Sequence, residues 1–282
     1  MALESLSTPI RAIKRPWELL FIGFLYATVA VFLATWIFRA YSSLIMVLLT
    51  VLVSVPLMYK SMKSEEEEAA KSKDQVDLLS HHGKTLRYLL FMFVGFLLAF
   101  AVWFVVLPTT IVQSLFSSQL ETIGAINSKI VGDAVGSGAI FLHIFLNNFK
   151  VLLFSLFFAF FFGAGAIFIL TWNASVISAA MGSFIKDKLA MWAAAGGVGA
   201  VSYFHAFSLG LLRYIIHGVP EIAAYFVGGL AGGIISVAMI NKDLETGRFK
   251  NIMIDAIDLV LIAVAMLLFA AFLEVYITPI FF

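Results

Sequence analysis

Apolar runs long enough to cross a lipid bilayer recur along this sequence, and they restrict its fold more than any other feature. A helix needs about 20 apolar residues to span the hydrocarbon layer, where the backbone finds no water to bond. Charged residues make up 12% of the chain, which is about half the share in a soluble domain. We therefore predict an all-α membrane protein, a polytopic bundle of about seven transmembrane helices. The predicted spans lie near residues 18–38, 43–59, 88–107, 149–171, 190–216, 221–240 and 253–277.

Basic residues predict the direction in which these spans run. With the N-terminus inside, most of the 18 Lys and Arg residues fall on inner segments, as the positive-inside rule requires. Lys186 and Lys188 belong to these inner segments, whereas Arg213 falls near the outer side. Tryptophans favour membrane interfaces, and Trp17 and Trp36 then fall at opposite ends of the first span. Both signals predict an N-in and C-out topology.

The composition also excludes several functions. A formal net charge of +1 gives no basis for a nucleic-acid partner. The absence of cysteine excludes disulfides, thiolate metal sites and a cysteine nucleophile. No catalytic or nucleotide-binding motif is present, and the spacing of His143, His205 and His217 matches no known metal site. We therefore expect a protein that is not an enzyme and that carries no metal and no cofactor.

Two polar intervals interrupt the apolar pattern. Residues 61–87 form a charged cytoplasmic linker, in which Glu65–Glu68 precede Lys71 with the spacing of a solvated helix. A docking site for a cytoplasmic partner is the alternative there. Residues 108–146 form a long outer loop, and long loops are often functional, so this one could bind a partner. A simple connection between spans is the alternative for this loop.

Within that loop, residues 139–148 are apolar but too short to cross a bilayer. We expect them to lie along the outer interface or to re-enter the membrane. His143 and Asn147 are four residues apart and so share a helical face. Asn148 suits the cap of the next span or a hydrogen bond between helices. Contact of these polar residues with a ligand is the alternative.

A polar ridge occupies the fifth and sixth predicted spans. His205, Arg213 and His217 are separated by multiples of four residues and so line one ridge, and Glu221 of the next predicted span can approach Arg213 or His217 across the turn. Gly218 suits a helix end and Pro220 suits the start of the next helix, so the pattern predicts a tight helical hairpin here. Ionisable residues at membrane depth also favour a polar cavity or an ion path. Both interpretations remain open from the sequence.

Small residues and carboxylates characterise the last two spans. Ala224, Gly228 and Gly232 form one ridge, which predicts close helix packing and a glycine-rich helical hairpin at the centre of the bundle. The same ridge would equally suit a homo-oligomer face. Asp258 and Glu274 fall near opposite ends of the last span, where interface placement is the default for a charged residue.

Several motifs resemble the stage II sporulation protein M family of integral membrane proteins. They are His217-Gly-Val-Pro-Glu221 before a glycine-rich helix, Asn147-Asn148-Phe-Lys150 before Phe162-Gly-Ala-Gly165, and Leu273-Glu274-Val-Tyr-Ile-Thr278-Pro279. The resemblance implies a SpoIIM-like transmembrane domain at 88–282 and an accessory transmembrane hairpin at 1–60. It also implies a helical fold and importance for His217, Glu221 and Glu274. In spore formers a member of this family acts as a membrane anchor or organiser with cell-wall-degrading partners.

We therefore predict a non-enzymatic integral membrane scaffold, or a subunit of a membrane protein complex, in the cell membrane. Its surroundings would be the lipid bilayer and membrane or extracytoplasmic protein partners, with a homo-oligomer as a further option. The alternative is a transporter or channel whose polar path is lined by His205, Arg213, His217 and Glu221. A third option, an intramembrane hydrolase with a His and Glu pair, would require a bound metal or an activated water.

Overall fold

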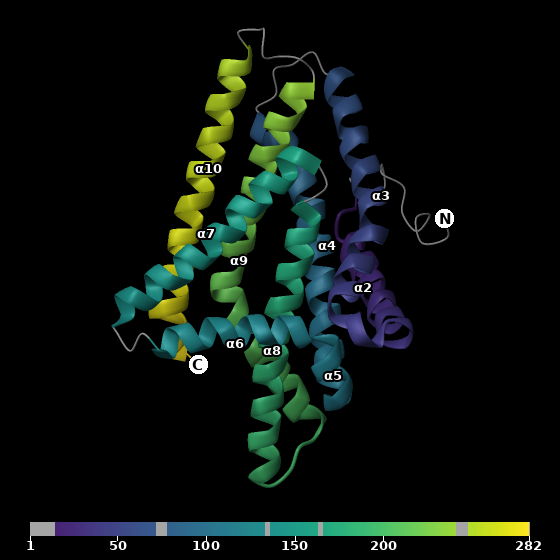
Figure 1. Cartoon of the computed structure of the whole chain (residues 1–282), viewed down its shortest axis with the longest axis vertical. Coiled ribbons are helices and arrows are strands. Elements are labelled where there is room, and N and C mark those ends of the chain that lie inside the picture. Colours follow the sequence, from purple (N-terminus) through teal and green to yellow (C-terminus); the bar gives the residue numbers. More distant parts are fainter. Residues whose placement is uncertain (1–14, 72–77, 133–135, 163–165, 241–247, 282) are drawn as a thin grey trace. The chain divides into compact units, whose positions relative to one another are not determined.

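The computed structural model describes residues 15–71, 78–132, 136–162, 166–240 and 248–281, and within these residues it contains helices and no strand. A short 3₁₀ turn, η1 (Arg39–Tyr41), follows the first helix, and a π-helical turn, η3 (Leu273–Ile277), interrupts the last. The α-helices in Figure 1 are α2 (Glu18–Ile37), α3 (Ser42–Lys71), α4 (Leu78–Val106), α5 (Thr109–Leu115), α6 (Ser117–Gly132), α7 (Ser137–Phe162), α8 (Ala166–Ala194), α9 (Ala200–Ile240), α10 (Arg248–Phe272) and α11 (Thr278–Phe281).

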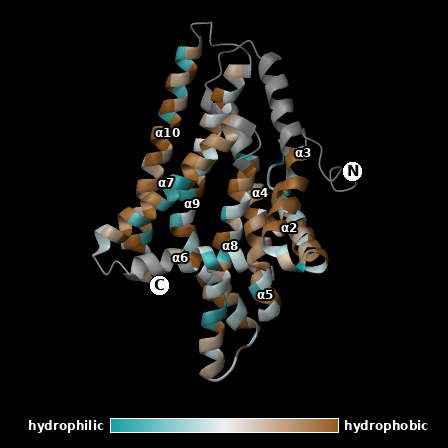
Figure 2. Cartoon of the chain, viewed as in Figure 1, coloured by the Kyte–Doolittle hydropathy of each residue, from teal (hydrophilic) through white to brown (hydrophobic). Residues whose placement is uncertain are grey.

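Seven candidate spans in the described part of the chain are long and apolar enough to cross a membrane. They are Glu18–Ile37, Arg39–Leu57, Leu89–Val106, Ser137–Phe160, Ile167–Ala194, Ala200–Ser236 and Phe249–Phe281. Figure 2 shows polar bands near the N-terminal end of α10 and hydrophobic residues along the rest of that helix. The predicted class, an all-α membrane protein with seven spans, is therefore confirmed. The N-in and C-out orientation stays a prediction.

The turn predicted at Gly218 is wrong, because α9 runs unbroken through this residue and through Pro220. The predicted spans 190–216 and 221–240 therefore contribute to one helix of 41 residues, about 61 Å long at 1.5 Å per residue. In a membrane, neighbouring helices stabilise a helix across glycine and proline, so these residues do not end it. The chain instead reverses just after α8, where Gly196 and Gly197 have φ angles of 143° and 124° that favour glycine.

The interval predicted as a long outer loop, 108–146, is also helical. It contains α5, α6 and the first turns of α7, and the segment 139–148 lies wholly within α7 rather than along an interface. Gln119 explains the error, because its polar side chain is buried and does not face solvent. Ser43 Oγ donates to Gln119 Oε1 at 2.7 Å, and Gln119 Nε2 donates to Ser175 Oγ at 3.0 Å. A polar interval in this chain therefore marks a hydrogen-bonded helix.

The boundaries of one predicted span and of the predicted cytoplasmic linker differ from the boundaries of the observed helices. The predicted span 149–171 covers the end of α7 and the start of α8, with residues 163–165 outside the described part of the chain. The predicted linker 61–87 is occupied at its ends by α3 and α4, while residues 72–77 within it lie outside the described residues.

The chain forms two compact units, the first of which comprises residues 1–119 and 170–178. In this unit the backbones of α2 and α4 touch, since a Cβ atom added at Gly23 would lie 2.5 Å from the Met92 carbonyl oxygen. Trp103 Nε1 on α4 donates to Thr28 Oγ1 on α2 at 3.0 Å. Ser178 Oγ of α8 donates to the Leu97 carbonyl at 2.8 Å. Helix α4 is thus held to α2 by close backbone contact and one side-chain hydrogen bond, and to α8 by another hydrogen bond.

The second unit comprises residues 120–169 and 179–282 and is built around α7, α9 and α10. A Cβ atom at Gly228 or Gly232 of α9 would collide with Leu152 or with the Leu156 carbonyl of α7, so these two helices approach at backbone distance. Ala231 of α9 packs with α10 in a buried apolar cluster. Small residues on two faces of α9 thereby allow α7 and α10 to pack closely on it.

Candidate functional site

Helices α7, α9 and α11 and the π-helical turn η3 of the second unit carry a set of polar side chains. We call this set the polar cluster, and it consists of Asn148 on α7, His217, Glu221 and Tyr225 on α9, Glu274 on η3 and Thr278 on α11. All six residues fall within candidate membrane spans. Buried polar groups there need protein partners, because hydrocarbon supplies none.

Glu221 is bonded from two directions. Tyr225 Oη, one turn further along α9, donates to Glu221 Oε1 at 2.7 Å. The side chain of Asn148 makes a second hydrogen bond to the same carboxyl from α7. Tyr225 is 0% exposed and Asn148 is 7% exposed, so both bonds are shielded from solvent. The Glu221 carboxyl therefore joins α9 to α7.

His217 is joined to the end of the chain. Its Nδ1 atom lies 3.4 Å from Thr278 Oγ1, and both side chains are buried. The Thr278 hydroxyl donates its proton to the Leu273 carbonyl at 3.0 Å. A hydroxyl carries a single proton, so Nδ1 of His217 must be the donor in the first contact. This contact joins α9 to α11, as Glu221 joins it to α7.

A change of helix type places Glu274 in the cluster. Residues Leu273–Ile277 form a π-helical turn, in which the Thr278 amide bonds to the Leu273 carbonyl five residues earlier. Pro279 accounts for this turn, because a proline ring clashes with the carbonyl four residues before it in an α-helix. Single π-helical turns are frequent at functional sites. Glu274 lies close enough to Glu221 and Arg213 for their charges to interact.

Arg213 lies one turn before His217 on α9. Its guanidinium carbon is 4.8 Å from the centre of the Phe184 ring on α8, a cation–π distance. Lys188 Nζ of α8 lies 5.3 Å from the centre of the same ring. The two cations therefore lie at the same height along the paired helices α8 and α9. The prediction that Lys188 and Arg213 lie on opposite sides of the bilayer is wrong.

The structure does not bring every predicted site residue together. His205 is exposed and stacks on Trp192 with ring centres 5.2 Å apart, about 18 Å along α9 from His217. His143 is partly buried on α7, while Asp258 is exposed on α10. Asn147 reaches the cluster only through Asn148, to whose Oδ1 its Nδ2 donates at 3.5 Å.

Other predicted residues serve the packing of the site. Ala224 is fully buried on α9, and Gly228 and Gly232 lie against α7. The glycine ridge is thus covered within the chain. Among the described residues, no group of three or more His, Asp or Glu side chains is arranged to hold a metal ion.

Tyr225 and Thr278 are members of the cluster that the sequence did not suggest as site residues. A signal for Tyr225 was present, because it lies four residues after Glu221 and so shares its helical face. For Thr278 the signal was the adjacent Pro279, which predicts a distortion of the preceding turn. Neither residue carries a charge at neutral pH, so neither stands out in the sequence as Glu221 and Glu274 do.

These features define a multi-pass α-helical membrane protein with a buried polar cluster in its C-terminal helices. The family model for stage II sporulation protein M matches residues 88–279, and the chain belongs to this family. The matched region begins within α4 and includes every residue of the polar cluster. Searches of curated proteins and of solved structures found no match.

Proposed function

We propose that the protein is a non-enzymatic scaffold or a subunit of a membrane protein complex in the cell membrane. The observation that carries this proposal is the hydrogen bonding within the polar cluster. Glu221 is bonded by Tyr225 and Asn148, and His217 is bonded to Thr278. Polar groups that bond one another across three helices fix the helices in place and leave few groups free for a substrate.

A rigid centre of this kind suits a protein whose outer helices bind other proteins. We propose membrane or extracytoplasmic protein partners for these surfaces. A homo-oligomer would need a face other than the Gly228 and Gly232 ridge, because α7 already covers that ridge. The membership of the sporulation protein M family supports a membrane-bound role of this type.

Affinity purification from native membranes tests the proposal. The tagged full chain is solubilised in a mild detergent, and the proteins that remain bound are quantified against it by mass spectrometry. We expect at least one membrane or extracytoplasmic protein at a fixed ratio to the chain. A tagged, unrelated multi-pass protein expressed at the same level is the control. Recovery of the chain alone, without a partner at fixed ratio, would contradict the proposal.

A second candidate function, transport, has one specific observation in its favour. The carboxyl group of Glu274, in one candidate membrane span, lies within range of electrostatic interaction with Glu221 and Arg213, which belong to another. Ionisable residues at such depth often mark ion or proton pathways. The path would not include His205, because this residue stacks on Trp192 away from the cluster. An ion flux through proteoliposomes that Glu221→Gln abolishes, with the fold retained, would favour transport over the scaffold.

A further inference from the structure

Two cations from different helices converge at one aromatic ring in the second unit. Lys188 of α8 and Arg213 of α9 both lie within cation–π distance of Phe184. The helices that carry them are in close contact, since a Cβ atom at Gly210 would lie 2.8 Å from Ile185 Cγ1. The relative position of the two cations is therefore set by helix packing and not by flexible loops.

Neither cation has a carboxylate at ion-pair distance within the described part of the chain. Asp187 is exposed beside Lys188 and pairs with neither residue. Glu274 interacts with Arg213 only through longer-range electrostatics, and Glu221 repels the charge of the same carboxyl. Two like charges near one ring repel each other, and an anion bound between them would offset this repulsion.

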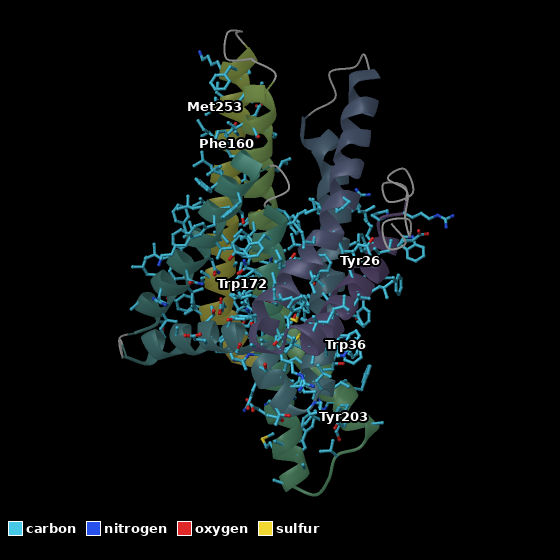
Figure 3. The ribbon with its side chains drawn as sticks, turned by 45° about the vertical axis from the view of Figure 1, so that its right-hand side comes forward. Tyr26, Trp36, Phe160, Trp172, Tyr203 and Met253 are labelled. Atoms are coloured by element: carbon cyan, nitrogen blue, oxygen red, sulfur yellow. The ribbon has the colours of Figure 1, made fainter. Side chains whose placement is uncertain are left out.

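The surroundings of this pair are apolar. Residues 189–212, which form the far end of the α8–α9 hairpin, contain no Asp, Glu, Lys or Arg. On the other side of the pair, towards the polar cluster, Ile215 is 45% exposed and Val219 is 55% exposed on α9. Tyr203 lies on the hairpin side of the pair, near the turn, as its label in Figure 3 shows. A charged pair that borders exposed apolar helix faces resembles the boundary between lipid headgroups and acyl chains.

We propose that Lys188 and Arg213 bind the phosphate of an anionic phospholipid headgroup, whose acyl chains lie along the exposed apolar face of α9 on the side of the polar cluster. Basic sites between transmembrane helices bind anionic headgroups in this way. The planar guanidinium of Arg213 can donate two parallel hydrogen bonds to phosphate oxygens. Lys188 supplies a second charge from the neighbouring helix. The proposal is independent of whether the protein is a scaffold or a transporter.

Native mass spectrometry of the purified full chain in detergent tests the proposal. The protein is titrated with phosphatidylglycerol and, separately, with phosphatidylcholine of the same acyl chains. We expect tighter binding of phosphatidylglycerol to the unaltered chain. A double variant, Lys188→Gln with Arg213→Gln, should weaken phosphatidylglycerol binding roughly 30-fold, because each such charge contributes about fivefold. Phosphatidylcholine binding should stay the same.

Two variants and one competitor complete the test. Lys250→Gln, at an exposed position on α10, is the matched control and should bind phosphatidylglycerol as the unaltered chain does. If the double variant loses its helical circular dichroism, Lys188→Gln alone replaces it with an expected loss of about fivefold. No preference for phosphatidylglycerol, or an equal loss in Lys250→Gln, would overturn the proposal. Displacement of the lipid by millimolar inorganic phosphate would also overturn it, in favour of a free-phosphate site.

Discussion

Replacing Tyr225 with phenylalanine removes one oxygen atom from the polar cluster and leaves the ring in place. The lost group is the hydroxyl that donates to Glu221 Oε1 at 2.7 Å. Because Tyr225 is fully buried, no water replaces it, and the carboxyl keeps its bond to Asn148 alone. A hydrogen bond contributes a net of about 0.5–1.5 kcal/mol, and a bond to a charged group about 1.5–3 kcal/mol. We expect the free energy of unfolding to fall by about 1–2 kcal/mol.

The second donor to the same carboxyl allows a stricter form of this experiment. Asn148→Ala removes the bond from α7, and the double variant removes both bonds. Residues that bond one group do not act independently, so we expect a coupling energy of at least about 0.5 kcal/mol between the two changes. Unfolding is followed by circular dichroism as sodium dodecyl sulfate replaces a mild detergent in mixed micelles. Additive losses, or a Tyr225→Phe variant as stable as the unaltered chain, would refute the shared role of Glu221.

Three further predictions concern single positions, each with a control from the same chain. Gly232→Ala should lower the thermal unfolding temperature because its Cβ atom meets the Leu156 carbonyl, whereas Gly233→Ala, with open space, should be neutral or stabilising. Gln119→Ala should cost about 1–2 kcal/mol of unfolding free energy, because Ser43 and Ser175 both lose a buried partner, and exposed Gln113→Ala should cost little. His217→Ala should destabilise the protein clearly more than His205→Ala, since His217 is 8% exposed and His205 lies on the surface. Equal effects within any of these pairs would contradict the packing described for that position.

The fold class could be predicted from the sequence because hydrocarbon thickness relates directly to the length of an apolar run. The boundaries could not, because the rules for helix ends come from proteins in water. Gly218 and Pro220 would end a helix there, yet α9 continues through both of them. The chain turns instead at Gly196 and Gly197. These residues belong to a run of small residues like those at which helices pack closely, so composition does not distinguish a turn from a packing segment.

The candidate site was predicted in part, for a related reason. His217, Glu221 and Glu274 were identified because charged residues stand out in an apolar chain. Their uncharged partners Tyr225 and Thr278 do not stand out, although each is bonded to one of the chain's own polar groups. The regular spacing of four residues also predicts a ridge that includes His205. In a helix of 41 residues, however, side chains on the same face can lie too far apart to belong to one site, and His205 is such a residue.

Access of water to the polar cluster tests the central claim most directly. The chain has no cysteine, so a single cysteine at position 217, 221 or 274 can be labelled without background. Open membrane fragments expose both faces to a small thiol reagent that does not enter lipid, and Ala195→Cys in the exposed turn after α8 gives the rate for full access. A closed structural cluster predicts no labelling at the three cluster positions while position 195 reacts. Labelling at position 221 at a rate near that of position 195 would show a hydrated path and contradict the scaffold account.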